Sequence, residues 1–297
     1  MDVMNQVLVL FLLILCGFTA VKAGWIREGG IQGLNAMVLY FSLPCLTVAK
    51  LQQEASPGLM LELSQVFVIG AVSILLSGAV AWYAVFRREA RPRRAVLTSM
   101  AMFSNAGFMG FPVLSAALGE DKLIYGVVYV GVFNLINWSI GIILFDRKAM
   151  SWKRLLCVPC LSASIVGLIL FVANIRLPSV LTNALDMLGN TTTPLAMMIV
   201  GARLTKLKLA DLGDVKLLLA CALRLLIFPL AVYGASLLLG VSEWVRGTLT
   251  LCTAMPCAAG LVIQAETYGG DGPMASRGVA VSTLLSAATI PLMLIIL

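Results

Sequence analysis

Apolar runs of about 20 residues most strongly limit how this chain can fold, because a helix of that length spans the hydrocarbon core of a bilayer. Only 12% of the 297 residues are charged, whereas a soluble domain carries about a quarter. The pattern predicts an all-α integral membrane protein of the cytoplasmic membrane, without a separate soluble domain. We expect ten transmembrane helices at 3–21, 31–50, 62–86, 94–117, 122–145, 154–173, 178–203, 215–239, 244–266 and 274–296.

Lys and Arg residues concentrate in alternate gaps between these runs. One set of gaps holds sixteen of them and the other holds four, and Arg224 lies inside a run. Because basic gaps stay on the cytoplasmic side of a membrane, we expect both termini on the outer side. This placement accounts for the net charge of +7, so we expect no nucleic-acid partner. Asp2 rather than a basic residue precedes the first run, which we therefore interpret as a retained span and not as a signal peptide.

Residues that could carry catalysis are scarce. The chain has no His and no pattern that pairs a nucleophile with a base or places metal ligands at a helical spacing. Cys157 and Cys160 have the spacing of a redox pair but lack its strand–helix context, so we interpret them as small residues of a membrane helix. We expect no catalytic residue, no metal site and no cofactor, and the protein is not expected to be an enzyme.

The fourth run contains an unusual stretch, SNAGFMGFP, at 104–112. It places Asn105, Gly107, Gly110 and Pro112 within nine positions of an apolar segment. Gly disfavours helix, and Pro lacks an N–H and clashes with the preceding turn. A helix broken inside a membrane leaves polar backbone groups that protein, water or a solute must satisfy. Transporters build binding sites in this way, so we expect a binding site here.

The two halves of the chain align without a gap when they are shifted by 150 residues. Helix-breaking residues coincide, for example Pro44 with Pro194 and Gly110 with Gly260. Each half, 1–150 and 151–297, holds five spans, so the two repeats must have opposite topology. The register predicts a second break in the ninth span, at Pro256 and Gly260. If both breaks meet at mid-bilayer, the N-terminal ends of half-helices there favour an anion.

Three segments resemble the auxin efflux carrier family, and bacterial members in particular. They are SNAGFMGFPV in span four, MPCAAGLVIQAETYGGD in span nine and SLPCL in span two. The resemblance covers essentially the whole chain. It implies a 5+5 inverted repeat like that of sodium/proton antiporters, with spans four and nine broken and crossing. It also implies a transport domain of spans 3–5 and 8–10 that moves against a scaffold of spans 1, 2, 6 and 7.

The resemblance also implies a substrate class and some site residues. Members of the family carry organic anions, either an auxin-like carboxylate or dicarboxylates such as malate and malonate. By position, Asn105 and Pro112 match the crossover of the fourth span and Pro256 matches that of the ninth. Plant carriers have a second proline where this chain has Gly260 and Leu261, so the geometry of the ninth span is less closely defined by the resemblance.

Three asparagines are candidates for substrate contact. The Asn105 amide can donate to a carboxylate, or it can cap the broken helix. Asn134 and Asn137 lie three residues apart, so they share a helix face. They either line the substrate path or join neighbouring helices through hydrogen bonds.

Charged residues inside the runs are the remaining candidates. An intramembrane Arg224 predicts a functional site, with Asp186, Glu266 or a substrate carboxylate as its partner, unless it extends to the cytoplasmic surface. Asp186 or Glu266 could carry a coupling proton if burial raised its pKa, or could lie at the water interface.

These features predict a secondary transporter that moves a small organic anion by alternating access. The alternatives are a cation- or proton-coupled exchanger of the same fold, and an anion receptor that does not transport. Besides the anion, the expected partner is the lipid bilayer. A homodimer is compatible with the sequence but not determined by it.

Overall fold

The structure, a computed structural model, describes residues 3–149, 158–205 and 213–297, and these ranges are almost entirely helical. The first half of the chain forms α1 (Val3–Lys22), α2 (Glu28–Met37), α3 (Leu43–Lys50), α4 (Pro57–Ala79), α5 (Arg91–Met102), α6 (Phe111–Leu118), α7 (Leu123–Ile136) and α8 (Ile142–Phe145). The second half forms α10 (Pro159–Val172), α11 (Ser179–Asn190), α12 (Thr192–Leu204), α13 (Val215–Ala222), α14 (Phe228–Leu238), α15 (Glu243–Ala254), α16 (Leu261–Thr267) and α17 (Gly272–Ile296).

Short π-helical segments join or extend several of these helices. They are η1 (Val38–Ser42) between α2 and α3, η2 (Val80–Val85) after α4, η3 (Ala106–Gly110) before α6, η5 (Asn137–Gly141) between α7 and α8, and η7 (Leu223–Ile227) between α13 and α14. A 3-10 turn, η4 (Glu120–Lys122), precedes α7. The joined helices are therefore longer than their separate labels suggest.

Five continuous helices in the described ranges are long and apolar enough to cross a membrane: Glu28–Lys50, Pro57–Val85, Glu120–Phe145, Val215–Leu238 and Gly272–Ile296. Shorter apolar helices cover Leu8–Lys22, Ala106–Leu118 and Pro159–Val172. The prediction of an all-helical, multi-pass membrane protein is thus confirmed. The start of the predicted span 154–173, with Cys157, lies outside the described residues.

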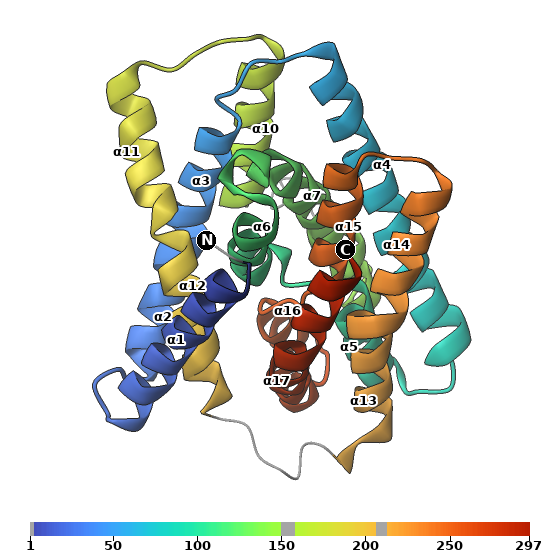
Figure 1. The fold of residues 1–297 in the computed structure, drawn as a ribbon. Coiled ribbons are helices and arrows are strands. Elements are labelled where there is room, and N and C mark those ends of the chain that lie inside the picture. The colour runs from blue at the N-terminus through green and yellow to red at the C-terminus, as the bar shows by residue number, and fades with distance from the viewer. Residues whose placement is uncertain (1–2, 150–157, 206–212) are drawn as a thin grey trace.

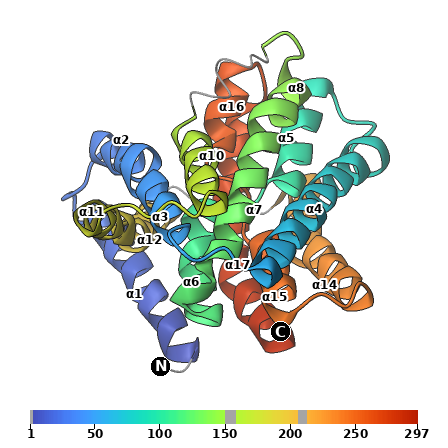
Figure 2. The same cartoon turned by 90° about the horizontal axis from the view of Figure 1, so that it is seen from above.

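The helices form two lateral groups around α6 and α7. Figure 1 shows α1, α2, α3, α11 and α12 on the left and α4, α5, α13, α14 and α15 on the right, with α16 and α17 of the second group near the middle, below α6. In Figure 2, α1 begins and α17 ends at the same end of the molecule, at the bottom of the view.

Glycines allow helices of the first group to approach one another at backbone distance. A Cβ atom added at Gly17 of α1 would overlap the carbonyl oxygen of Met198 in α12, and one added at Gly201 would overlap that of Ile14. Gly167 of α10, which packs beside this group, closely approaches the side chain of Leu51, directly after α3, and a Cβ atom there would lie 3.5 Å from Cα of Val48. Small residues provide such close approach in membranes, where no hydrophobic effect drives helices together.

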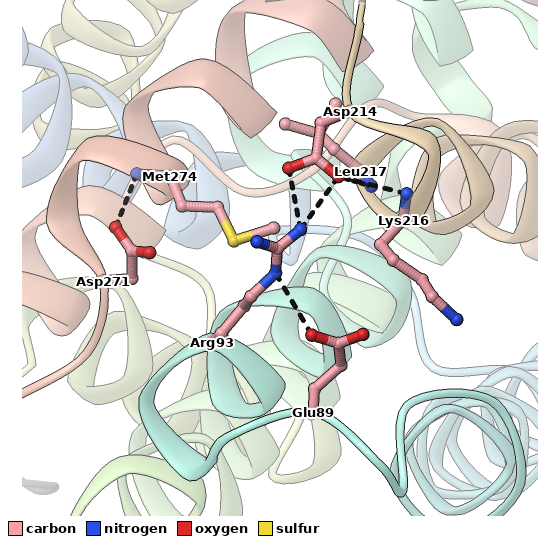
Figure 3. Close-up of polar contacts among 7 residues, drawn as sticks. All are labelled: Glu89, Arg93, Asp214, Lys216, Leu217, Asp271 and Met274. Carbon is pink, nitrogen blue, oxygen red and sulfur yellow. Dashed lines mark hydrogen bonds and ion pairs between the residues drawn. The ribbon is translucent and has the colours of Figure 1, made fainter.

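An ion-pair cluster joins helices of the second group (Figure 3). Asp214 caps α13 by accepting from the N–H groups of Lys216 and Leu217. Both of its carboxylate oxygens also lie 2.9 Å from Nη2 of Arg93 in α5, while Nε of Arg93 is 3.2 Å from Glu89. The cluster holds the start of α5 against the start of α13.

Candidate functional site

The predicted fourth span is interrupted in the structure. Helix α5 ends at Met102, residues 103–105 are not helical, and η3 then leads into α6. The interruption thus lies at the start of the SNAGFMGFP stretch, and Gly107, Gly110 and Pro112 belong to the helical part that follows. Pro112 lies inside the continuous helix Ala106–Leu118, directly after the wider π-helical turn of η3, an irregularity of the kind that accommodates a proline within a helix.

The predicted ninth span is interrupted as well. Helix α15 ends at Ala254 and α16 begins at Leu261, with a non-helical segment at 255–260 between them. Pro256 lies inside this segment, and Gly260 immediately precedes α16 with a negative φ of −71°. A Cβ atom at Gly260 would meet nothing within 4 Å, so its glycine is not required by crowding.

The two non-helical segments cross and pair with each other. The Asn105 N–H donates to the carbonyl of Pro256 at 2.7 Å, and the Ala258 N–H donates to that of Phe103 at 2.9 Å. Together they form an isolated antiparallel bridge between Ser104 and Cys257. Each segment thus satisfies backbone groups that the other interruption exposes, as buried irregular backbone requires. We refer to residues 103–105 and 255–260 as the crossing.

Asn105 is buried at the crossing, with only 7% of its surface exposed. Its carbonyl accepts from the N–H groups of Met109 and Gly110. Its side chain does not cap the following turn, and no hydrogen bond of its amide is found within the described ranges. The amide is also not among the fully enclosed side-chain atoms that lack a partner, so its atoms keep some access from outside the packed core. The capping alternative is wrong, and the amide remains available to a solute.

The other candidates of the first half surround the crossing from different elements. A Cβ atom at Gly110 would lie 3.7 Å from Met255, and one at Gly107 would lie 3.7 Å from Leu43 of α3. Asn134 and Asn137 are buried at the junction of α7 and η5. Gln264 of α16 donates to the Asn137 carbonyl at 3.5 Å, so Asn137 joins neighbouring helices through its backbone.

Arg224 has none of its expected carboxylate partners among the described residues. Its side chain is 1% exposed and does not extend to the surface. Its donors instead contact the backbone carbonyls of Ala101, Met102 and Thr253. The expectation of Asp186 or Glu266 as the partner is therefore wrong, because these carbonyls at the ends of α5 and α15 need donors of their own. Asp186 lies half-exposed on α11, away from this contact.

A polar cavity of about 620 Å³ lies between the two helix groups. Its walls come from α2, α12, α16 and α17 and include the polar residues Glu28, Gln32, Asn35, Arg203, Glu266 and Arg277. Ala259 and Val262 line it too, so it reaches the crossing at its ninth-span side. Of the predicted site residues, only Glu266 belongs to the wall.

Arg203 is one of the polar cavity residues that the sequence did not indicate. It lies at the end of the seventh run and was counted only as a charge that indicates topology. In the structure its Nη1 donates to the carbonyl of Ala259 at 3.3 Å. In the sequence, Arg203 differs little from other cations at the ends of apolar runs, and its nearness to Gly201 is a weak signal.

The fold defines a multi-pass helical membrane protein with a polar cavity that ends at paired, non-helical backbone. Sequence comparison adds its functional class. A family model described as "membrane transport protein" matches residues 2–151 and 147–294. The chain belongs to this family, which is of the auxin efflux carrier type, and the resemblance seen in its motifs is confirmed.

Relatives match over nearly their full length. An uncharacterized transporter of Methanothermobacter thermautotrophicus is 27% identical over 99% of this chain and 98% of its own. An uncharacterized transporter of Methanocaldococcus jannaschii is 25% identical over 97% of each chain. A protein of Rhizobium meliloti described as a "putative malonate transporter" is 21% identical over 97% of this chain and 94% of its own.

Proposed function

We propose that the protein is a secondary transporter that moves a small organic anion across the cytoplasmic membrane by alternating access. The main support for this proposal is that the polar cavity extends to the crossing, where Ala259 forms part of its wall. A solute in the cavity can reach Arg203, whose guanidinium already contacts the non-helical segment of the ninth span. The unpartnered amide of Asn105 lies on the other strand of the crossing.

The charges around the cavity favour a carboxylate at its inner end. Arg203 and Arg277 are half-buried, whereas Glu266 is exposed. Arg presents a planar fork of donors that matches a carboxylate bidentately. Glu28 also lines the cavity and lies close enough to Arg203 to interact with it electrostatically. We expect an incoming carboxylate to compete with Glu28 for Arg203.

A 5+5 inverted repeat is supported by contacts that recur at a shift of 150 residues. Gly17 packs on Met198, and the equivalent Gly167 packs on the equivalent Val48. Gly119 and Gly269 both have positive φ, as do Gly24 and Asn174. Recurrence of both packing and backbone conformation favours two related units, 1–150 and 151–297, over a chance alignment.

A sliding boundary between the two helix groups is part of the proposal. Helices α1 and α12 face α6 and α17 across a small crevice lined almost wholly by apolar side chains such as Ile14, Val113 and Ile290. Apolar surfaces lack directed bonds that must break before they slide, so this crevice favours relative movement. The ion pairs of Arg93 keep α5 and α13 together in the proposed moving group. The basic gaps would face the cytoplasm, with both termini outside.

Uptake of labelled carboxylates into proteoliposomes tests the proposal. We expect uptake of at least one compound from a panel that contains malonate, other dicarboxylates and an indole monocarboxylate. Removing the cation with Arg203→Ala should lower the rate about tenfold or more, as expected for one lost charge-assisted hydrogen bond. Arg246→Ala, at the other side of the fold, serves as the matched control. Binding without uptake would instead indicate a receptor.

A second contact predicts where the pathway is closed. Lys50 ends the continuous helix Glu28–Lys50, about 33 Å from the cavity residues at its start. Its Nζ lies 2.8 Å from Glu120, which also accepts from Ser115. This ion pair joins the first helix group to the turn between α6 and α7. We interpret it as the closed end of the pathway in this conformation.

A covalent link between positions 50 and 120 should therefore block transport. We expect the double variant Lys50→Cys/Glu120→Cys, treated with a short linker that forms a disulfide with each thiol, to lose uptake and to regain it when a reductant cleaves those disulfides. Each single variant, treated in the same way, controls for native thiols such as the exposed Cys16. A linked double variant that transports at the wild-type rate would show that this contact need not open.

A further inference from the structure

Arg224 lies in η7, between α13 and α14, and is among the most deeply buried large side chains. Its Nε donates to the carbonyl of Thr253 at 2.9 Å, and Nη2 donates to the same oxygen. Its Nη1 donates to the carbonyls of Met102 at 2.9 Å and Ala101 at 3.2 Å. The guanidinium thus bridges two segments that lie far apart in the sequence.

The three acceptors share one structural position. Ala101 and Met102 are the last two residues of α5, and Thr253 is the penultimate residue of α15. The last carbonyls of a helix have no partner within the helix, and they carry partial negative charge. Both helices end inside the protein, so water cannot satisfy these oxygens. A cation with several donors satisfies both ends together.

The shape of the guanidinium matters as much as its charge. Its planar fork points Nε and Nη2 at one oxygen and Nη1 at two others, which a compact ammonium group cannot reproduce from a single point. A buried charge is expensive, so it persists only when its partners compensate it well. Here carbonyl dipoles compensate it together with the nearby Tyr129 hydroxyl, and no carboxylate is among its contacts within the described ranges.

We propose that the ends of α5 and α15 form a guanidinium-specific cation site, which Arg224 fills permanently. Arg224 is then a positioning residue: it fixes the two helix ends from which the crossing starts, and so fixes Asn105 relative to the 255–260 segment. A free guanidinium ion should bind the same carbonyls when the side chain is removed. Alkali cations, which lack directed donors, should not replace it.

Thermal unfolding of purified Arg224→Ala protein in detergent tests the site without requiring transport. We expect its unfolding midpoint to lie below that of the wild type and to rise by several degrees with millimolar guanidinium, because a ligand that binds only the native state stabilises it. Equal concentrations of NaCl and KCl should produce no such rise. The wild type, whose site is filled, should not be stabilised by guanidinium.

Uptake by the same variant provides the functional readout. We expect Arg224→Ala to lose at least about nine-tenths of carboxylate uptake, equivalent to about 1.4 kcal/mol or more, and guanidinium to restore much of it. If guanidinium raises the unfolding midpoint of Arg224→Ala but the wild type shows no measurable uptake, the site is supported and only the transport proposal is contradicted. No response to guanidinium in folded Arg224→Ala, or an equal response to KCl, would overturn the site.

Two further variants keep the proposal testable if Arg224→Ala does not fold. Arg224→Lys retains the charge, and Arg224→Gln retains polar length without charge. We expect the unfolding midpoint to fall from wild type to Lys to Gln, with uptake by the Lys variant well below wild type. Equal midpoints for the Lys and Gln variants would show that the site does not select a cation, and would overturn the proposal.

Discussion

Carboxylate binding by Asn105→Ala protein is expected to be weaker than that of the wild type by roughly 10- to 100-fold, the effect of losing one hydrogen bond to a charged group. The physical reason is that Asn105 is buried at the crossing while its amide has no partner in the described part of the chain. Stabilisation of the purified protein by a series of carboxylates, measured by thermal unfolding, provides the affinities.

Two controls separate binding from folding at this position. Asn105→Asp keeps the shape of the side chain but places a negative charge beside the anion, so it should bind even more weakly than Asn105→Ala. Asn183→Ala changes an exposed residue of α11 and should bind like the wild type. Equal stabilisation of wild type and Asn105→Ala by the same carboxylate would exclude Asn105 as a ligand.

Gly201→Ala is expected to destabilise the protein by about 1–3 kcal/mol or more, the usual range for overpacking a well-packed contact. The added methyl group would overlap the carbonyl oxygen of Ile14 and approach Phe18 to within 2.8 Å of its backbone nitrogen. These are backbone atoms and cannot turn aside, so α12 must move away from α1. A lower unfolding midpoint and less monodisperse protein would record the loss.

Gly234→Ala is the matched control for this substitution. Gly234 also lies in a helix, α14, but a Cβ atom there would meet nothing within 4 Å. The exchange should be neutral or stabilise by up to about 1 kcal/mol, because Ala favours helix over Gly. If both variants unfold at the same temperature as the wild type, the close approach of α1 and α12 is not required for stability.

Apolar length and backbone chemistry made much of the fold predictable. The described helices follow the predicted spans closely, since a membrane span needs both apolar side chains and satisfied backbone groups. The same reasoning located both interruptions near Asn105 and Pro256. It did not locate the ends of these interruptions. A proline such as Pro112 can either break a helix or be accommodated in one, depending on the turn before it, and here that turn is the π-helical segment η3.

The partners of side chains were less predictable than the elements. A charge pattern suggested a carboxylate for Arg224, but a sequence cannot show that two helices end beside that side chain. The role of Arg203 was missed for a related reason: the topology rule treats cations at the ends of spans alike, whether they face water or a cavity. Both residues act on backbone carbonyls, which every residue has and no pattern distinguishes.

The most direct test of the anion site is an experimental density map of the protein with a transported carboxylate bound. We expect density for the ligand at the crossing, within hydrogen-bonding distance of the Asn105 side chain and continuous with the cavity that Arg203 lines. A carboxylate bound elsewhere, with the amide of Asn105 still unoccupied, would contradict this expectation.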